Sequence, residues 1–160
     1  MLVADPEFFM EQALLEAEKA AAVGEVPVGA VVVIQNQIVA RAHNRVEEKT
    51  DATQHAEMLA IQEASERVGN WRLTNASLFV TLEPCSMCMG AIILARIPEL
   101  YFGCYDDKMG AVGSLYDLSD TGELPADIDV YPELLAEKSK DLLQEFFSAR
   151  RREKLAAVLH

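Results

Sequence analysis

The order of hydrophobic and polar positions along the chain predicts helices that alternate with strands. Apolar residues at helical spacing, bounded by capping residues and glycines, predict helices over residues 5–23, 55–68, 85–96 and 132–155. Runs rich in β-branched and aromatic residues predict strands over residues 27–34, 38–42, 77–82, 100–103 and 128–131. Between them, residues 44–54 are polar and irregular, and residues 117–127 form an acidic loop. Strands and helices in alternation predict an α/β fold with helices on both faces of a sheet.

Length and composition favour one folded domain over residues 1–160. With 160 residues, of which 51% are hydrophobic, the chain can bury a core of the size that one domain needs. No apolar run approaches the roughly 20 residues that cross a bilayer. The acidic residues Asp5, Glu7 and Glu11 stand where a signal peptide has its basic start. We therefore expect a cytoplasmic protein without a membrane partner.

Charge is distributed unevenly along the chain. The net charge of −12 disfavours nucleic acid as a partner, because contacts to phosphates supply most of that affinity. The acidic residues gather in residues 1–25 and 117–145, where solvated surface is the simplest interpretation. In contrast, residues 150–154 hold three arginines and one lysine against one glutamate. Any contact with nucleic acid is therefore expected to be local.

Three metal-ligating residues stand at predicted helix starts. His55 begins one helix, and Cys85 and Cys88 lie in the first turn of another, where i,i+3 spacing places both sulfurs on one face. The positive end of a helix lowers the pKa of a thiol and so favours the thiolate that zinc requires. A redox dithiol and a structural zinc site are the alternatives for the Cys pair. The remaining cysteine, Cys104, falls in a strand, where an inert thiol is the simpler interpretation. Three ligands leave one zinc position open, as in catalytic sites.

Glu57, two residues after His55, offers a base beside this candidate zinc site. A carboxylate that is not itself a ligand can take a proton from an activated water and deliver it elsewhere. Compensation of the helix dipole is the alternative for an acidic residue in a first turn. However, His-x-Glu followed by Pro-Cys-x-x-Cys is the known signature of zinc deaminases, and residues 55–57 and 84–88 match it.

Longer stretches of the chain resemble the bacterial tRNA adenosine deaminases of the cytidine/deoxycytidylate deaminase superfamily. The matching segments include EVPVGAV (25–31), HNR (43–45), HAEMLAI (55–61), NWRL (70–73), LFVTLEPCSMCMGAI (78–92), GAVGSL (110–115) and DLLQEFF (141–147). The resemblance implies a three-layer α/β/α, cytidine-deaminase-like fold with a five-stranded mixed sheet. It also implies a single zinc-dependent deaminase domain that forms a homodimer.

The same resemblance implies a reaction, hydrolytic deamination of adenosine to inosine at the wobble position of a tRNA anticodon. The expected partner is therefore an anticodon stem-loop. One Zn²⁺ per subunit would be held by His55, Cys85 and Cys88. Glu57 would carry protons between the attacking water and N1 of adenine.

Four further residues match positions that contact substrate in the family. Asn44 would hydrogen-bond the flipped base, although a turn-forming Asn is the alternative. Asp106 would contact the ribose and backbone beside the target base. Phe147 and Arg150 would line the RNA path along the last helix. Their alternatives are ordinary helix core for Phe147 and a solvated helix end for Arg150.

Three positions depart from the residues usual in this family. Ala52 stands where a proline commonly precedes the zinc histidine, Ala126-Asp127 replaces an Asn-His pair, and Ser139 replaces a cysteine. None of them belongs to the predicted zinc site. A deaminase of a small free base, nucleoside or nucleotide is the alternative enzyme. A zinc-binding module without activity is the alternative of another class, which Glu57 disfavours.

Overall fold

The computed structural model describes residues 3–120, 122–123, 125 and 127–159, and these contain a five-stranded mixed sheet. Its strands are β1 (Gly29–Ile34), β2 (Gln37–His43), β3 (Ala76–Leu82), β4 (Glu99–Cys104) and β5 (Asp129–Tyr131). They lie in the order β2-β1-β3-β4-β5. β1 is antiparallel to both its neighbours, and β3, β4 and β5 are parallel to one another.

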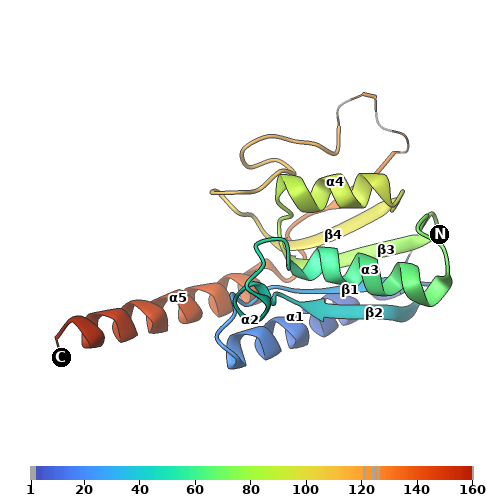
Figure 1. The fold of residues 1–160 in the computed structure, drawn as a ribbon. Coiled ribbons are helices and arrows are strands. Elements are labelled where there is room, and N and C mark those ends of the chain that lie inside the picture. Colours follow the sequence, from blue (N-terminus) through green and yellow to red (C-terminus); the bar gives the residue numbers. More distant parts are fainter. Residues whose placement is uncertain (1–2, 121, 124, 126, 160) are drawn as a thin grey trace.

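Helices cover both faces of this sheet (Figure 1). The helices among the described residues are α1 (Pro6–Ala22), α2 (Val46–Lys49), α3 (Ala56–Val68), α4 (Ser86–Leu94) and α5 (Ala136–Val158). α1 and the first part of α5 pack on one face, and α3 and α4 lie side by side on the other. The predicted three-layer arrangement of helices and sheet is therefore confirmed.

The alternation of side chains along each strand divides the apolar core in two. Val32 and Phe102 belong to the cluster under α3 and α4, whereas Val31, Phe79 and Tyr101 belong to the cluster under α1. The rings of Phe79 and Tyr101 stack with their centroids 4.4 Å apart. Because both faces are covered, the central strands are apolar at nearly every position, which is why the sequence shows continuous runs there.

The last helix begins later than the sequence predicted. α5 starts at Ala136 rather than at residue 132, because Glu133 and Leu135 adopt φ angles of 62° and 52°, which a right-handed helix excludes. The backbone N–H of Leu134 instead donates to the carbonyl of Phe102, over 3.0 Å. The hydrophobic pattern could not reveal this turn, since Leu134 and Leu135 are apolar residues that pack against the core, as a helix would also have predicted.

One smaller difference concerns an irregular segment. The stretch 44–54 contains the one-turn helix α2, which was not predicted. Ala126 lies outside the residues that the structure describes.

Ser139 is buried where α5 crosses β4. A Cβ added at Gly103 would lie 2.4 Å from the Oγ of Ser139. The small pair at Ser139 and Gly103 thus lets α5 approach the strand closely.

Only the first part of α5 packs on the sheet. Its later part extends away from the other elements, with Leu155, Val158 and Leu159 exposed (Figure 1). No helix among the described residues is long and apolar enough to cross a membrane.

Replacing Gly29 by Ala is expected to lower the free energy of unfolding by at least about 3 kcal/mol, because the methyl group meets rigid backbone. A Cβ at Gly29 would lie 2.0 Å from the carbonyl oxygen of Ala13 and 2.5 Å from the backbone nitrogen of Ala17, both in α1. Gly90→Ala is the control, because a Cβ there meets nothing within 4 Å and alanine favours the helix. Denaturant titration of both variants tests this, and equal stabilities would contradict it.

Candidate active site

The candidate site lies where α3 and α4 begin, at the end of β3. His55 is the N-cap of α3 and Cys85 the N-cap of α4, both with extended backbone. Neither side chain makes the usual capping hydrogen bond to its own helix. Pro84 follows the end of β3 and directs the chain into the turn before Cys85. The two N-caps therefore leave imidazole and thiol groups free to meet between the helices.

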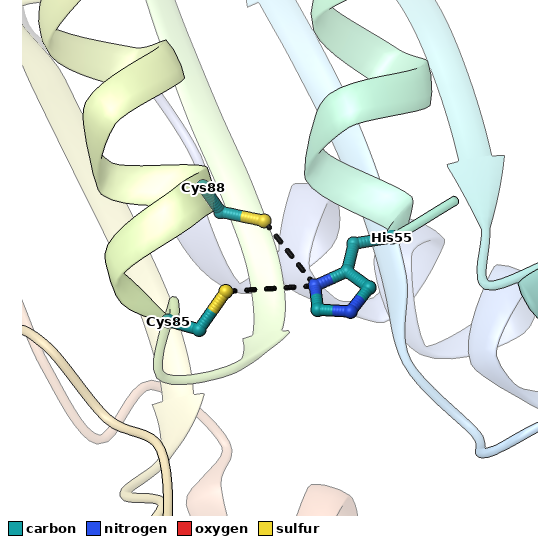
Figure 2. A group of neighbouring side chains, drawn as sticks. All are labelled: His55, Cys85 and Cys88. Carbon is teal, nitrogen blue, oxygen red and sulfur yellow. Dashed lines mark hydrogen bonds between the residues drawn. The ribbon is translucent and has the colours of Figure 1, made fainter. Parts of the chain in front are cut away.

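The imidazole of His55 points between the two sulfurs (Figure 2). Its Nδ1 lies 3.6 Å from Sγ of Cys85 and 3.5 Å from Sγ of Cys88. The three ligand atoms all lie within 4.8 Å of one another. A tetrahedral zinc ion with ordinary Zn–S and Zn–N bonds places its ligand atoms about 3.5–3.8 Å apart. The donor set and its spacing therefore fit zinc, and the predicted ligands are brought together as expected.

The surroundings of Cys85 favour the charged form that a metal needs. A hydrogen bond from the Cys88 thiol and another with His55 lower the pKa of Cys85 to about 4. The pKa of Cys88 is raised, because its thiol donates to Cys85 and is buried. The pKa of His55 is raised by its hydrogen bond with Cys85 and by the nearby Glu57. Cys85 therefore favours the thiolate, Cys88 keeps its proton, and His55 binds a proton more strongly than a free imidazole does.

Zinc binding is therefore expected to release the proton of Cys88, together with any proton that His55 holds on its metal-binding nitrogen. The affinity should fall as the pH falls, by about tenfold per pH unit for each proton released. Calorimetric titration of chelator-treated protein, in buffers of different ionisation enthalpy, measures the number of protons. An affinity that does not change with pH would contradict this assignment.

Glu57 lies in the first turn of α3, with its side chain directed into the same site. The residue is 4% exposed, and burial raises the pKa of its carboxyl. A buried carboxyl with a raised pKa both accepts and returns a proton more readily near neutral pH than an exposed one. The arrangement can therefore combine a metal-activated nucleophile with a proton carrier.

A cavity of about 250 Å³ opens onto this site, and Asn44 and Asp106 line it together with His55, Glu57 and Cys85. The amide oxygen of Asn44 accepts the backbone N–H of Ala56 over 2.9 Å, at the first turn of α3. With its oxygen held in this way, Asn44 offers its NH₂ group as a donor to a ligand. Asn44 is thus more than a turn residue, because it ties the cavity wall to the helix that carries Glu57.

Asp106 lines the same cavity from the segment that follows β4. Its Oδ1 accepts the backbone N–H groups of Lys108 and Met109, over 3.0 and 3.3 Å. The carboxylate is therefore held at a tight turn, while Met109 adds an apolar side chain to the cavity.

Sequence reasoning did not select two buried glutamates beside this cavity. Glu25 is 2% exposed and accepts the backbone N–H groups of Glu47 and Glu48, so it caps α2 from a distant segment. Glu83 is equally buried and holds residues 106–114. The available signal was an acidic residue inside an otherwise apolar segment, which is rare unless the charge is paired or hydrogen-bonded.

The residues predicted on the last helix lie outside this cavity. Phe147 lines a separate groove of about 570 Å³ between α5 and the segment 104–108, with Tyr105, Lys108 and Arg151. Arg150 does not line that groove. Its guanidinium donates to the carbonyl of Gly24 over 3.0 Å and lies 4.9 Å from the ring of Phe146.

The groove and the cavity share one short segment. Asp106 faces the cavity, whereas its neighbours Tyr105, Asp107 and Lys108 face the groove. Phe147 is 41% exposed, so it is not the ordinary core residue that an amphipathic helix would suggest. The core interpretation fails because this ring lines the groove instead of packing into either apolar cluster of the core.

Comparisons with known proteins agree with this geometry. Residues 4–104 match the family model for the cytidine and deoxycytidylate deaminase zinc-binding region. A tRNA-specific adenosine deaminase of Streptococcus pyogenes serotype M1 is 46% identical over 153 residues, covering 95% of this chain and 90% of that protein. The chain is also similar to a solved structure from work on A-to-I editing by tRNA:A34 deaminases at the wobble position. That likeness has a TM-score of 0.80 and 45% identity, and covers 85% of this chain and 99% of the other.

A guanine deaminase from Nitrosomonas europaea shares the fold at lower identity. Its TM-score is 0.73 with 25% identity, covering 91% of this chain and 86% of the other. The cytidine-deaminase-like fold is therefore confirmed. In sequence the chain is more similar to the tRNA-specific adenosine deaminases, at about 45% identity, than to this guanine deaminase, at 25%. Since the chain contains the zinc-binding region of this superfamily and is 46% identical to a tRNA-specific adenosine deaminase over 95% of its length, it belongs to the family of tRNA-specific adenosine deaminases.

Proposed function

We propose that the protein hydrolytically deaminates adenosine to inosine at the wobble position of a tRNA anticodon. The observation that carries this proposal is the cavity in which His55, Cys85 and Glu57 meet Asn44 and Asp106. The relatives at about 45% identity are named for the same reaction. An unstacked anticodon loop is the RNA element from which a base is most easily turned into such a cavity.

His55, Cys85 and Cys88 are proposed to hold one zinc ion per subunit. Zinc bound in such a site would lower the pKa of a water molecule, so that the water becomes nucleophilic near neutral pH. No side chain here offers that chemistry. Elemental analysis of the purified protein measures the ratio, and a value well below one ion per chain would contradict the stoichiometry.

Glu57 is proposed to move the protons of the reaction. Its carboxylate takes a proton from the water and gives it to N1 of adenine, which makes C6 more open to attack. The oxygen of the deprotonated water adds to C6. Glu57 then carries the proton of the new C6 hydroxyl to the exocyclic nitrogen, so that the C–N bond breaks, ammonia leaves and the C6 carbonyl of inosine forms. The burial of Glu57 excludes bulk water from these steps.

Asn44 and Asp106 are proposed to hold the flipped nucleoside. The NH₂ group of Asn44 is suited to an acceptor on the purine edge. The carboxylate of Asp106 is an acceptor and is suited to the ribose hydroxyls. Together they orient C6 toward the site formed by His55 and the two cysteines.

The groove beside α5 is proposed to hold the RNA next to the target base. Tyr105 and Phe147 expose rings on which bases can stack. Lys108, Lys140 and Arg151 offer cations, although three acidic residues line the same groove. Cations and acids are therefore balanced there, and recognition depends on stacking and on the cavity more than on charge. Arg150 is proposed to contribute indirectly, because its hydrogen bond to the carbonyl of Gly24 holds α5 in place beside the groove.

Replacing both Lys140 and Arg151 by Ala is expected to weaken stem-loop binding and its dependence on salt. If each cation contacts one phosphate of a single strand, the log–log slope becomes shallower by about 1.4. Fluorescence anisotropy in a Glu57→Gln background measures binding without turnover. The control pair is Lys19→Ala with Lys49→Ala, two lysines away from the groove. Identical slopes in both double variants would contradict the assignment of the groove.

The alternative is deamination of a small free base, nucleoside or nucleotide, because a guanine deaminase shares the fold. Incubation with an anticodon stem-loop and, separately, with free adenosine, guanine and cytidine distinguishes the two. Inosine formed in the stem-loop supports the proposed function. Turnover of the free compounds alone would exclude it.

A homodimer is proposed from the outward face of α4. This helix is strongly apolar, Leu94 on it is 67% exposed, and Met87 and Ala91 are half-buried. Since the described surface leaves these side chains uncovered, a second copy is the proposed cover. Light scattering should show a dimer that Leu94→Glu shifts toward monomer, and a wild-type monomer would contradict it. A cytoplasmic location is proposed from the tRNA substrate, and cell fractionation tests it.

A further inference from the structure

The Glu83 carboxylate lies under the segment that forms one wall of the cavity. It accepts the backbone N–H of Asp106 over 2.9 Å, that of Val112 over 2.9 Å and that of Ser114 over 3.1 Å. The Ser114 hydroxyl donates a fourth, short hydrogen bond. Hydrogen bonds to a charged acceptor are roughly twice as strong as neutral ones. One side chain thus holds both ends of the segment 106–114.

Backbone contacts join the same two segments. The N–H of Glu83 donates to the carbonyl of Cys104, and the N–H of Ala111 donates to the carbonyl of Pro84, each over 2.9 Å. Cys85 and Gly110 form an isolated antiparallel bridge. A Cβ at Gly110 would lie 2.2 Å from Oε1 of Glu83, so only glycine leaves room for the carboxylate. The cavity wall is therefore built around Glu83, two residues before a zinc ligand.

We propose that Glu83 is a positioning residue, which fixes Asp106 relative to the zinc ligands and thereby prepares the cavity for the nucleoside. Glu83 acts through Asp106, because its own carboxylate is occupied by four donors from the protein. Without this anchor the segment 106–114 must order itself when the substrate binds, and that cost reduces affinity. This inference rests on the proposed function, since it assigns Asp106 to the bound nucleoside.

The first test compares Glu83→Gln with the wild type in steady-state deamination of an anticodon stem-loop. Gln keeps the volume but turns an NH₂ group toward backbone donors. The expected result is a KM raised about tenfold, with kcat within about twofold and zinc content unchanged. Glu99→Gln is the matched control, because Glu99 is also buried but accepts from Ser77 at the opposite end of β3. A KM equal in both variants, or loss of zinc from Glu83→Gln, would overturn the proposal.

A double-mutant cycle separates positioning from general destabilisation. In an Asp106→Ala background, Glu83→Gln should raise KM by less than about twofold, because the group that it positions is gone. Full additivity of the two changes would overturn the proposal. Ser114→Ala provides a milder variant that removes one of the four donors, and its KM should rise in the same direction by a smaller factor.

Hydrogen exchange tests the anchor without any assay of activity. The amides of Asp106, Val112 and Ser114 should exchange at least about tenfold faster in Glu83→Gln, with little change on the Asn44 side of the cavity. Unchanged exchange at these amides would overturn the anchor itself. If the anchor is present but the stem-loop is not deaminated by the wild type, the proposed function has failed instead.

Discussion

Substitution of Glu57 by Gln is expected to lower kcat for an anticodon stem-loop by about 10²–10⁴-fold, the range typical of lost proton transfer. Gln cannot accept a proton from water or return one to the base. The substitution changes neither the volume of the side chain nor any of the three zinc ligands. Zinc content and stem-loop affinity are therefore expected to stay near the wild-type values. Inosine formation under single-turnover conditions, with zinc measured in the same preparation, gives the result.

Glu66→Gln is the matched control for this substitution. Glu66 lies on the same helix but is exposed, so its replacement should leave kcat unchanged. A Glu57→Gln protein with full zinc and wild-type kcat would show that another group carries the protons. If zinc is lost with Glu57→Gln, the residue instead supports the metal site, and its catalytic assignment is wrong.

Substitution of Cys88 by Ser is expected to remove most of the zinc and to reduce deamination to background. Cys88 supplies one of three ligand atoms that lie within 4.8 Å of one another. A hydroxyl is a much poorer ligand for zinc than a thiolate, and two remaining ligands hold the ion weakly. Because bound metal stabilises the folded state by mass action, the melting temperature should also become less sensitive to added zinc.

The third cysteine provides the control for this variant. Cys104 is partly buried at the end of β4, and burial raises the pKa of its thiol to about 11. Cys104→Ser should therefore retain zinc and activity. Elemental analysis of both variants is the measurement. Full zinc in Cys88→Ser, or its loss from Cys104→Ser, would contradict the assigned ligand set.

The agreement between sequence and structure is best at the zinc ligands, and it has a local cause. Cys85 and Cys88 share one helical turn, so their spacing alone brings the sulfurs together. His55 and Glu57 likewise share the start of one helix. Only the meeting of these two helix ends depends on the fold, and the match to a known signature predicted it.

The agreement is poorer where a residue's neighbours come from distant segments. The position of Arg150 follows from its contact with Gly24, which is 126 residues away in the chain. Arg151, rather than Arg150, faces the groove with Phe147, because one residue along a helix turns the side chain by about 100°. A sequence motif that reads FF followed by arginines cannot distinguish between the two.

The sequence by itself determined the alternation of helices and strands, the candidate zinc ligands and Glu57. These depend on hydrophobic periodicity and on spacing within single turns of helix, which act over a few residues. Only the tertiary structure decided where α5 begins, how Asn44 is oriented, and that Glu25 and Glu83 support the two walls of the cavity. Each of these depends on a hydrogen bond between two different segments of the chain. Such a bond forms only after the sheet has brought its two partners together.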